Sequence, residues 1–443
     1  MRDGFPPGWS TTPLNSLCEK LRGVSYKRDE ASPIPRDGYL PILRAGNIDA
    51  DRLTFNELVW VPASRVSGQQ KLRKGDVVVA MSSGSKSVVG KTAQAREDWE
   101  GAFGAFCGVL RPSPKIDSRY LGLFLRTREY RAKISDLAAG SNINNLKNEH
   151  FAEIEVPLPP LPEQRRIVAK LEKLLAKVDT CENGLAKIPV LLKRFRQSVL
   201  AAACSGRLTA DWREKNPVSP VGATSETDAE DLPVGWESVC VGDVIENLKY
   251  GTAQKCSYEK RGVPVLRIPN VVDGTIDQAD LKYAELSPKE LAQLRLHPGD
   301  ILLIRSNGSV SLVGRCALVR EQERSFAYAG YLIRIRPRRT IVESEFLNLA
   351  LSSYNVRLQI ELEARSTSGV NNINSEEVRT LRFSLPPLAE QKEIVRRVEA
   401  LFALADQIEA RCARAKVHAG NLTQSILAKA FRGELVPSKA ELV

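Results

Sequence analysis

A segment that occurs twice without any change of length constrains the fold more than any other feature of this sequence. The segment from Leu158 to Leu208 begins with Leu-Pro-Pro-Leu-Pro-Glu-Gln, and its second copy begins with Leu-Pro-Pro-Leu-Ala-Glu-Gln. Gln164 recurs as Gln391, and the matches as far as Gly206 and Gly433 keep the same offset of 227 positions. Surface loops accept insertions and deletions, whereas a helix packed along its length does not. The constant offset therefore predicts one long, packed helix in each copy.

The apolar residues of both copies recur at the spacing of an α-helix. In the first copy they fall at positions i, i+1, i+4, i+7, i+8 and i+11 and form one narrow stripe between Arg and Lys side chains. Pro162 suits the first turn, and Glu163 and Glu390 suit the positive end of a helix dipole. A narrow stripe favours pairing with another helix, and the two copies are the natural partners. The side chains expected at this contact are Ile167, Leu171, Leu174, Leu175, Val178, Ile394, Val398, Leu401, Phe402 and Ala405.

One proline distinguishes the two predicted helices. Ile188-Pro189 interrupts the first copy, whereas the residue equivalent to Pro189 in the second copy is Lys416. Proline has no amide hydrogen to donate, and its ring clashes with the preceding turn of a helix. We therefore expect the first helix to kink or break at this position and the second helix to continue.

Each predicted helix follows a related module. Pro-Pro-Gly-Trp, ending at Trp9, reappears as Pro-Val-Gly-Trp, ending at Trp236, and the Gly-Asp pair at Asp76 returns at Asp300. The offsets within the modules drift from 223 to 227, so the modules have accepted small insertions that the helices have not. The chain is therefore organised as module, helix, module, helix, which implies pseudo-two-fold symmetry within one chain.

Inside each module, short β-rich runs follow the Gly-Asp pairs, while residues 120–134 and 345–362 are predicted to be helices. The expected fold class is therefore α/β (α+β), with two pseudo-symmetric mixed α/β modules whose sheets are strongly bent. A stretch rich in Ser, Thr, Pro and acidic residues separates the two halves and is typical of a linker. The expected divisions are module one 1–157, central helical region 158–208, linker 209–232, module two 233–384, distal helical region 385–437 and C-terminal tail 438–443.

Composition limits the class of protein. A chain of 443 residues exceeds the usual size of a single domain, and it contains no apolar run of about 18 residues that would span a membrane. The eight cysteines form no C-x-x-C pair, and with only three histidines a zinc cluster is not expected. The N-terminus lacks the layout of a signal peptide, so a reduced, cytoplasmic protein is the simplest expectation. The net charge of +11 favours a polyanionic partner.

The predicted helices have a length that suits DNA. At a rise of about 1.5 Å per residue, the stretch from Glu163 to Lys187 forms a rod of roughly 38 Å. Half-sites read by symmetric DNA-binding dimers lie about 34–36 Å apart for each turn of the double helix. Two modules attached to such rods could read two half-sites at this spacing, although the match does not exclude other uses.

The duplicated modules, the Leu-Pro-Pro-Leu-x-Glu-Gln helix starts and the Gln-Ser-Val/Ile-Leu helix ends resemble the specificity (S) subunit of type I restriction-modification systems. The resemblance covers essentially the whole chain. It implies two target recognition domains, each reading one half of a bipartite site in double-stranded DNA, with helices that pair as an antiparallel coiled coil. It implies further that these helices dock two modification (methyltransferase) subunits, which restriction (motor nuclease) subunits then join. S-adenosylmethionine, ATP and Mg would belong to those partners, so no cofactor, metal or membrane is expected on this chain.

One loop nearly matches a phosphate-binding loop. Residues 85–92 lack the glycine that the pattern requires where Ser85 stands. In the duplicate, Gly314 is followed by Arg315 and Cys316, so the hydroxyl that would bind Mg is absent. Nucleotide binding is therefore not expected. The retained Ser/Asn-Gly-Ser and the basic residue after the last glycine suit a tight turn that presents amides and hydroxyls to DNA, and a purely structural hairpin remains an alternative.

Asparagine-rich turns and arginines at loop starts are the other candidates for DNA contact. Asn can bond adenine through two atoms, and Arg can bond guanine or phosphate. A turn in which the Asn side chain bonds only the backbone is the structural alternative. The candidate DNA-binding residues are Arg44, Asn47, Ser82, Ser83, Ser85, Lys86, Lys91, Asn142, Asn144, Asn145, Arg267, Asn270, Arg305, Ser306, Asn307, Ser309, Arg315, Ser368, Asn371 and Asn372.

No catalytic set emerges from the sequence. The three histidines lie far apart, and neither an Asn-Pro-Pro-Tyr/Phe methyltransferase box nor a glycine-rich cofactor turn is present. The sequence therefore predicts a non-catalytic subunit that recognises DNA. Two other hypotheses remain open at this stage, namely an unusual nuclease or methyltransferase, and a coiled-coil scaffold whose modules bind something other than DNA.

Overall fold

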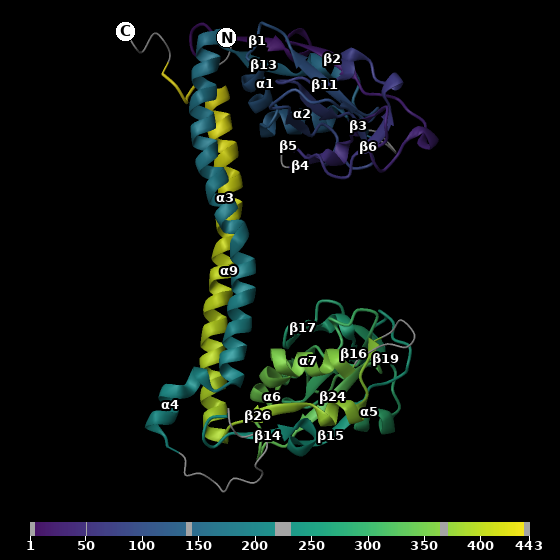
Figure 1. Cartoon of the computed structure of the whole chain (residues 1–443), viewed down its shortest axis with the longest axis vertical. Coiled ribbons are helices and arrows are strands. Elements are labelled where there is room, and N and C mark those ends of the chain that lie inside the picture. Colours follow the sequence, from purple (N-terminus) through teal and green to yellow (C-terminus); the bar gives the residue numbers. More distant parts are fainter. Residues whose placement is uncertain (1–4, 50, 139–143, 218–231, 364–370, 438–443) are drawn as a thin grey trace. The chain divides into compact units, whose positions relative to one another are not determined.

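The computed structural model describes residues 5–49, 51–138, 144–217, 232–363 and 371–437 (Figure 1). It divides into two compact units, one made of residues 1–186 and 413–443 and the other of residues 187–412. Two 44-residue helices, α3 (Leu161–Cys204) and α9 (Leu388–Phe431), each contribute one part to each unit. The first unit thus contains the first module and the second unit contains the second module.

The two modules have the same sheet topology. Each contains a four-stranded antiparallel sheet and a three-stranded sheet in which one strand pair is parallel. In the first module the larger sheet has the order β2 (Cys18–Arg22), β11 (Cys107–Pro112), β7 (Val77–Ala80), β9 (Thr92–Gln94), and the smaller has the order β10 (Ala102–Phe103), β3 (Tyr39–Leu43), β6 (Val59–Pro62). The second module repeats these as β15 (Ile245–Tyr250), β24 (Leu332–Pro337), β20 (Ile301–Ile304), β22 (Cys316–Leu318) and as β23 (Ala327–Tyr328), β16 (Val263–Leu266), β19 (Lys282–Ala284).

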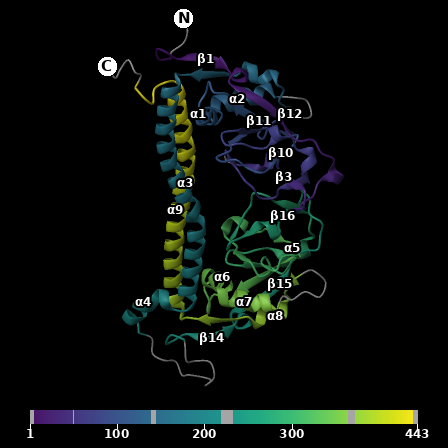
Figure 2. The same cartoon turned by 45° about the horizontal axis from the view of Figure 1, so that its top comes forward.

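Shorter pairs and helices complete each module, and Figure 2 shows several of them from a second side. The first module adds β1 (Ser10–Pro13) with β13 (Glu155–Leu158), β4 (Ile48–Asp49) with β5 (Arg52–Leu53), and the helices α1 (Ser118–Phe124) and α2 (Arg128–Leu137). The second adds β14 (Glu237–Cys240) with β26 (Arg382–Leu385), β17 (Val271–Val272) with β18 (Thr275–Ile276), and the helices α5 (Pro288–Leu294), α6 (Ser344–Leu351), α7 (Tyr354–Glu363) and α8 (Ser375–Thr380). The predicted mixed α/β fold is confirmed.

Each long helix predicted inside a module is in fact two short helices. Residues 120–134 are divided into α1 and α2, and residues 345–362 into α6 and α7. At the first division the Thr127 hydroxyl donates to the carbonyl of Phe124 at 2.8 Å and accepts from the amide of Tyr130 at 3.2 Å. A hydroxyl that bonds the backbone in this way ends one helix and caps the next. The helical spacing of the sequence alone does not show that the Thr127 hydroxyl competes with the helix backbone for these bonds.

The aspartates of the Gly-Asp pairs found in the sequence are buried and form ion pairs with half-buried arginines. Asp76 is 1 % exposed and accepts two bonds from the Arg111 guanidinium, at 2.9 and 2.7 Å. Asp300 is 2 % exposed and accepts two bonds of 2.7 Å from Arg336. Each carboxylate also accepts the amide three residues before it, so it fixes the turn that precedes β7 or β20. The same ion pair therefore stabilises the larger sheet of both modules.

The sequence motif at each helix start joins the helix to its module. The Trp9 indole donates to the Glu163 carboxylate at 3.1 Å, so the module entry contacts the first turn of α3. The buried Gln164 amide accepts from the backbone of Asp117 at 2.8 Å and donates to the carbonyl five residues before it at 2.8 Å. Gln391 repeats both bonds with the corresponding backbone groups of its own module. The Glu-Gln pair is thus a structural joint between module and helix.

The second joint is more extensive than the first. Glu390 is 1 % exposed and accepts from the Trp236 indole at 2.9 Å, from the Thr209 hydroxyl at 2.6 Å and from the Arg213 guanidinium. Thr209 precedes α4 (Ala210–Lys215), so the first part of the segment expected to be a linker is helical and bonded to α9. Residues 218–231, the rest of that segment, lie outside the described residues.

The two long helices pack side by side in antiparallel orientation (Figure 1). In the second unit, Arg196 of α3 bonds Asp406 at 2.7 Å and Glu409 at 3.0 Å of α9, whereas Ala203, further along α3, shares a core with Val398, which lies earlier in α9. Because one numbering rises as the other falls, the helices run in opposite directions. The expected antiparallel pairing is confirmed.

The predicted apolar stripe has two kinds of neighbour. In the first unit, Ile167, Leu171 and Leu175 share a core with residues 427, 430 and 431 of α9, and the same core contains α1, α2 and β13 of the module. In the second unit, Ile394 and Val398 share a core with residues 199 and 203 of α3 and with module residues. Val178 and Ala405 are also buried, whereas Leu174, Leu401 and Phe402 are half-buried. The predicted residues of α3 therefore pack against the last turns of α9, and the predicted residues of α9 pack against the last turns of α3.

The expected interruption at Ile188-Pro189 is wrong as a break. The helix α3 is continuous from Leu161 to Cys204, with Pro189 inside it. An exposed proline removes only one backbone bond, and the packing of the flanking turns outweighs that loss. Buried residues on both sides, Val178 and Leu192, supply such packing.

No helix within the described residues is both long enough and apolar enough to cross a membrane.

Candidate nucleic-acid interface

Two distant segments of the first module meet in a short strand pair. β8 (Ser82–Ser83) pairs antiparallel with β12 (Asn144–Asn145), so Ser82 lies opposite Asn145 and Ser83 opposite Asn144. We call these four residues the first polar strip. Asn145 is exposed and the two serines are half-buried. The strip thus brings together two of the predicted clusters, while Asn142 lies outside the described residues.

The second module builds the same pair from different side chains. β21 (Ser306–Asn307) pairs antiparallel with β25 (Asn371–Asn372), and these four residues form the second polar strip. The Arg305 guanidinium donates to the Asn372 amide oxygen at 3.2 Å and lies 4.7 Å from the ring centre of Tyr250. Both polar strips offer hydroxyls, side-chain amides or both at a strand edge, and these groups can bond base edges. Ser368 lies outside the described residues.

A serine-rich turn follows the first strand of each polar strip. The amide of Ser85 donates to the Ser83 hydroxyl at 3.1 Å, and the amide of Ser309 donates to the Asn307 side chain at 2.9 Å. Ser85, Lys86 and Ser309 are exposed. A side-chain oxygen that accepts the amide two residues later stabilises such a turn. The turn therefore presents an exposed lysine beside the first polar strip.

The near-match to a phosphate-binding loop is a hairpin between β7 and β9. Gly90 and Gly314, which end the loops, have φ angles of 73° and 77°, a backbone conformation that favours glycine. An added Cβ at Gly90 would lie 2.5 Å from the Ile134 side chain. The Arg131 guanidinium of α2 bonds two loop carbonyls, those of residues 87 and 89, at 3.2 and 3.0 Å. In the second module Arg357 of α7 does the same with residues 311 and 313. These bonds anchor the loop to α2 in the first module and to α7 in the second.

The basic residues that follow these glycines, Lys91 and Arg315, have different surroundings. Lys91 is half-buried beside the hairpin. Arg315 donates to the carbonyl of Ser311 at 3.2 Å and forms a long ion pair, 3.7 Å, with Asp273. A contact between Arg315 and phosphate would therefore compete with these neighbours.

The two predicted Arg and Asn turns are used inside the protein. Asn47 is 4 % exposed, accepts from the amide of Arg44 at 2.8 Å and donates to a carbonyl at 2.9 Å. Asn270 is 1 % exposed and makes the equivalent bonds with Arg267 and with two carbonyls. The Arg267 guanidinium also bonds Asp280 at 2.8 Å, which lowers the pKa of that carboxyl. This geometry favours a structural role for both asparagines.

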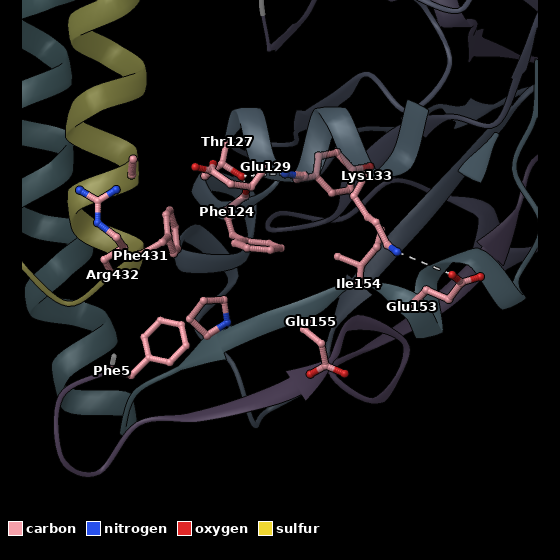
Figure 3. Close-up of a pocket in the computed structure, with 13 residues that line it drawn as sticks. Phe5, Phe124, Thr127, Glu129, Lys133, Glu153, Ile154, Glu155, Phe431 and Arg432 are labelled. Atoms are coloured by element: carbon pink, nitrogen blue, oxygen red, sulfur yellow. Dashed lines mark hydrogen bonds and ion pairs between the residues drawn. The ribbon is translucent and has the colours of Figure 1, made fainter. Parts of the chain in front are cut away.

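A cavity of about 450 Å³ lies in the first unit between α1, α2, β13 and the end of α9 (Figure 3). Phe124 and Phe431 form its apolar wall, and Lys133 pairs with Glu153 at its side at 3.8 Å. The Thr127 hydroxyl in its lining already makes two backbone bonds. The cavity lies between the module and the end of α9, and its lining combines apolar and charged side chains.

Burial makes four of the cysteine thiols poor nucleophiles. Burial raises the pKa of the Cys18, Cys107 and Cys204 thiols to about 12 and that of Cys316 to about 11, so these thiols are protonated at neutral pH. Among the residues that the structure describes, no three His, Cys, Asp or Glu side chains gather as metal ligands.

Four residues beside the polar strips were not predicted from the sequence. Arg131 and Arg357, which hold the serine-rich turns, occupy equivalent positions of the two copies. Phe106 and Tyr331 also occupy equivalent positions, and their side chains are 69 % and 64 % exposed. An arginine or an aromatic residue is kept at each of these positions in both copies, one strand away from a candidate cluster. This retention was the signal that could have identified them.

The fold and the polar strips define a class of protein in which two duplicated modules carry equivalent polar strand pairs and are joined by pairing helices. The sequence model of the family described as "Type I restriction modification DNA specificity domain" matches residues 6–189 and again residues 233–415. The chain therefore belongs to this family and contains its domain twice.

Named relatives agree with this assignment. The chain is 42 % identical over 432 residues to the type I restriction enzyme EcoKI specificity subunit of Escherichia coli (strain K12), covering 97 % of this chain and 90 % of the relative. It is 41 % identical over 434 residues to the StySPI specificity subunit of Salmonella potsdam, with coverage of 98 % and 90 %.

Solved structures share the fold. A chain from a study of complex assembly and conformational transition of the type I R-M system has a TM-score of 0.72 at 21 % identity, covering 98 % of this chain and 100 % of that one. The HsdS subunit from Thermoanaerobacter tengcongensis has a TM-score of 0.54 at 20 % identity, with coverage of 97 % and 98 %.

Proposed function

We propose that this chain is the DNA sequence-specificity subunit of a type I restriction-modification complex. Residues 1–157 read one half of a bipartite target and residues 233–384 read the other half. The observation that carries this proposal is the construction of an equivalent polar strip in both modules from segments far apart in sequence. Because the strips carry different side chains, the two half-sites differ and the target is asymmetric.

Affinity and specificity come from different groups in this proposal. Exposed cations such as Lys86, with the net charge of +11, contact phosphates and make binding dependent on salt. The amides and hydroxyls of the polar strips contact base edges and supply the sequence preference. The shape of the DNA between the contacts adds to that preference.

The partners and cofactors follow from the same proposal. The paired helices set the spacing of the modules and dock two modification (methyltransferase) subunits, through which restriction (motor nuclease) subunits join. S-adenosylmethionine, ATP and Mg bind those partners, and this chain itself is non-catalytic and works in the cytoplasm. The relatives described above, which are specificity subunits of type I restriction enzymes, support this assignment.

A module exchange tests the proposed function. Residues 232–384 are replaced by the corresponding module of another specificity subunit, the chimera is produced with its modification subunits, and the methylated adenines of the host genome are mapped. One half of the methylated motif should change while the other half stays the same. The reciprocal exchange of residues 1–157 is the matched control and should change the opposite half. Unchanged motifs in both chimeras would refute the assignment.

A methylation assay separates this proposal from an enzymatic function. The purified chain is incubated with duplex DNA and labelled S-adenosylmethionine, alone and with its modification subunits. Methyl transfer should require the modification subunits. Transfer by the chain alone would show that it carries its own catalytic site.

A further inference from the structure

An exposed aromatic side chain stands beside the polar strip in each module. Phe106 lies in the turn between β10 and β11, and Tyr331 lies in the equivalent turn between β23 and β24. A single exposed aromatic residue on a protein surface is ordinary. Here, however, both modules keep an aromatic ring at the same exposed position. The neighbouring residue is not kept, since Met81 in the first module corresponds to Arg305 in the second. Packing cannot explain this retention, because most of each ring is in solvent.

Backbone bonds fix each aromatic turn to its polar strip. The carbonyl of Phe106 accepts from the amides of Met81 at 2.8 Å and Ser82 at 3.3 Å, and Ser82 belongs to the first polar strip. The carbonyl of Tyr331 accepts from the amide of Arg305 at 2.9 Å, directly before the second polar strip. The ring of each turn is therefore attached to the strand that carries the candidate base contacts.

The turns themselves are rigid. The amide of Cys107 donates to the carbonyl of Gly104 at 2.8 Å, and the amide of Leu332 donates to that of Ala329 at 2.9 Å. Each turn is also covered by a neighbouring backbone, since a Cβ added to Gly23 would clash with the Gly104 oxygen and one added to Gly251 would clash with the Ala329 oxygen. A ring on a turn that is already ordered loses little further conformational entropy on contact with a ligand.

We propose that Phe106 and Tyr331 are specificity-determining residues that place an aromatic ring against the bases of each DNA half-site. This inference rests on the proposed function and deepens it. The ring supplies apolar contact to a base edge or base step, which the hydroxyls and amides of the polar strips cannot supply. Recognition in each module then combines polar bonds from the polar strip with one apolar contact from the adjacent turn.

Binding of the complex with its modification subunits to cognate and random duplexes tests the proposal. Phe106→Ala and Tyr331→Ala should each weaken binding to the cognate duplex by about 5- to 150-fold, as expected for the loss of recognition at one base pair of a duplex site. Binding to random duplex should change less. The dependence of affinity on salt should keep its slope, because no phosphate contact is removed. Lys86→Ala is the comparison and should lower that slope by about one.

Two further variants control for the fold and for the ring. Tyr354→Ala removes an aromatic side chain of α7 that is 74 % exposed and should leave cognate binding unchanged. Phe106→Leu keeps an apolar side chain without a ring, and it should retain part of the affinity lost in Phe106→Ala. All variants should unfold at the wild-type temperature, because they change exposed positions.

The outcomes distinguish this proposal from the proposed function. If the wild-type complex prefers its cognate duplex but Phe106→Ala and Tyr331→Ala bind it as tightly as wild type, the aromatic contact is refuted and the function stands. Equal losses on cognate and random duplexes would also overturn a role in specificity. If the wild-type complex shows no sequence preference at all, the proposed function itself fails.

Discussion

Asp76 and Asp300 fix the turns that precede β7 and β20 of the larger sheets. Each carboxylate is buried and accepts two bonds from one arginine, Arg111 or Arg336. We predict that Arg111→Ala and Arg336→Ala each destabilise their own module by about 3–5 kcal/mol, because each leaves a buried carboxylate without its cation. Urea unfolding followed by hydrogen exchange in the two modules measures this.

A matched control uses an exposed ion pair. Arg324 pairs with Glu321 at 2.7 Å, and both side chains are more than 60 % exposed, at 64 % and 69 %. Arg324→Ala should therefore change stability by less than about 1 kcal/mol. A similar small effect for Arg336→Ala would contradict the structural role assigned to the Gly-Asp pair.

The sequence predicted the positions of the candidate residues better than their roles. Ser82 and Asn145 come from separate clusters, and only the strand pairing shows that they lie opposite each other. Asn47 and Asn270 share the residue type and turn setting of the other candidates, yet their amides bond carbonyls inside the fold. Sequence cannot distinguish an amide that faces solvent from one that is satisfied internally, because that depends on segments brought together by folding.

The joint at the start of α9 is an element whose stability depends on a buried carboxylate. Glu390 accepts from Trp236, Thr209 and an arginine, whereas the equivalent Glu163 is bonded by Trp9. We predict that Glu390→Ala destabilises the second unit by about 3–5 kcal/mol, because Arg213 then lacks its buried partner. Glu163→Ala is the matched control and should cost the first unit less. Chemical unfolding with hydrogen exchange in each unit measures both, and equal losses would contradict the difference between the joints.

Pro189 offers a test of how α3 tolerates a helix breaker. Proline in a helix interior costs about 3 kcal/mol relative to alanine. Pro189→Ala should therefore raise the stability of the chain by up to about 3 kcal/mol, since the residue is exposed and the helix continues through it. Lys416→Ala, at the equivalent position of α9, is the control and should change stability by less than about 0.5 kcal/mol. A loss of stability in Pro189→Ala would indicate that the proline is needed for the shape of α3.

The sequence predicted the elements well where one physical signal dominated. The constant offset and the apolar stripe identified both long helices, because helical packing forbids a change of length. The division of α1 from α2 was missed, because the Thr127 hydroxyl competes with the backbone over a single turn. The helix α4 was also missed, since its polar composition is typical of a linker and its order comes from bonds to α9, such as that between Asp211 and Arg397 at 2.6 Å.

The duplication accounts for the arrangement of module, helix, module and helix along the whole chain. Each module is closed by the first part of one long helix and by the last part of the other. In the first module α1 and β13 share a core with α3 and α9, and in the second module α6 and β26 share a core with both helices. A module and the helix that follows it in sequence are therefore not a complete structural unit. This arrangement could not be read from the offsets alone, because an antiparallel pair and a parallel pair have the same sequence pattern.

Deletion of residues 413–443 tests this division of the chain. The deletion removes Leu427, Ala430 and Phe431 from the core of the first unit, where the Phe431 ring lies 5.0 Å from that of Tyr120 and 5.4 Å from that of Phe124. All segments of the second unit remain. Limited proteolysis should therefore cut the first unit rapidly and leave a resistant fragment from the second unit.

A single substitution provides the graded form of the same experiment. Phe431→Ala should destabilise the first unit by about 3–5 kcal/mol, as expected for a large buried ring, and should leave the second unit unchanged. Cys204 is the equivalent residue of the first copy, and Cys204→Ala removes only one sulfur from the second unit, so its effect should be smaller. If the deletion left the first unit as resistant as the second, the end of α9 would not be part of that core, and each module would instead fold with its own helix alone.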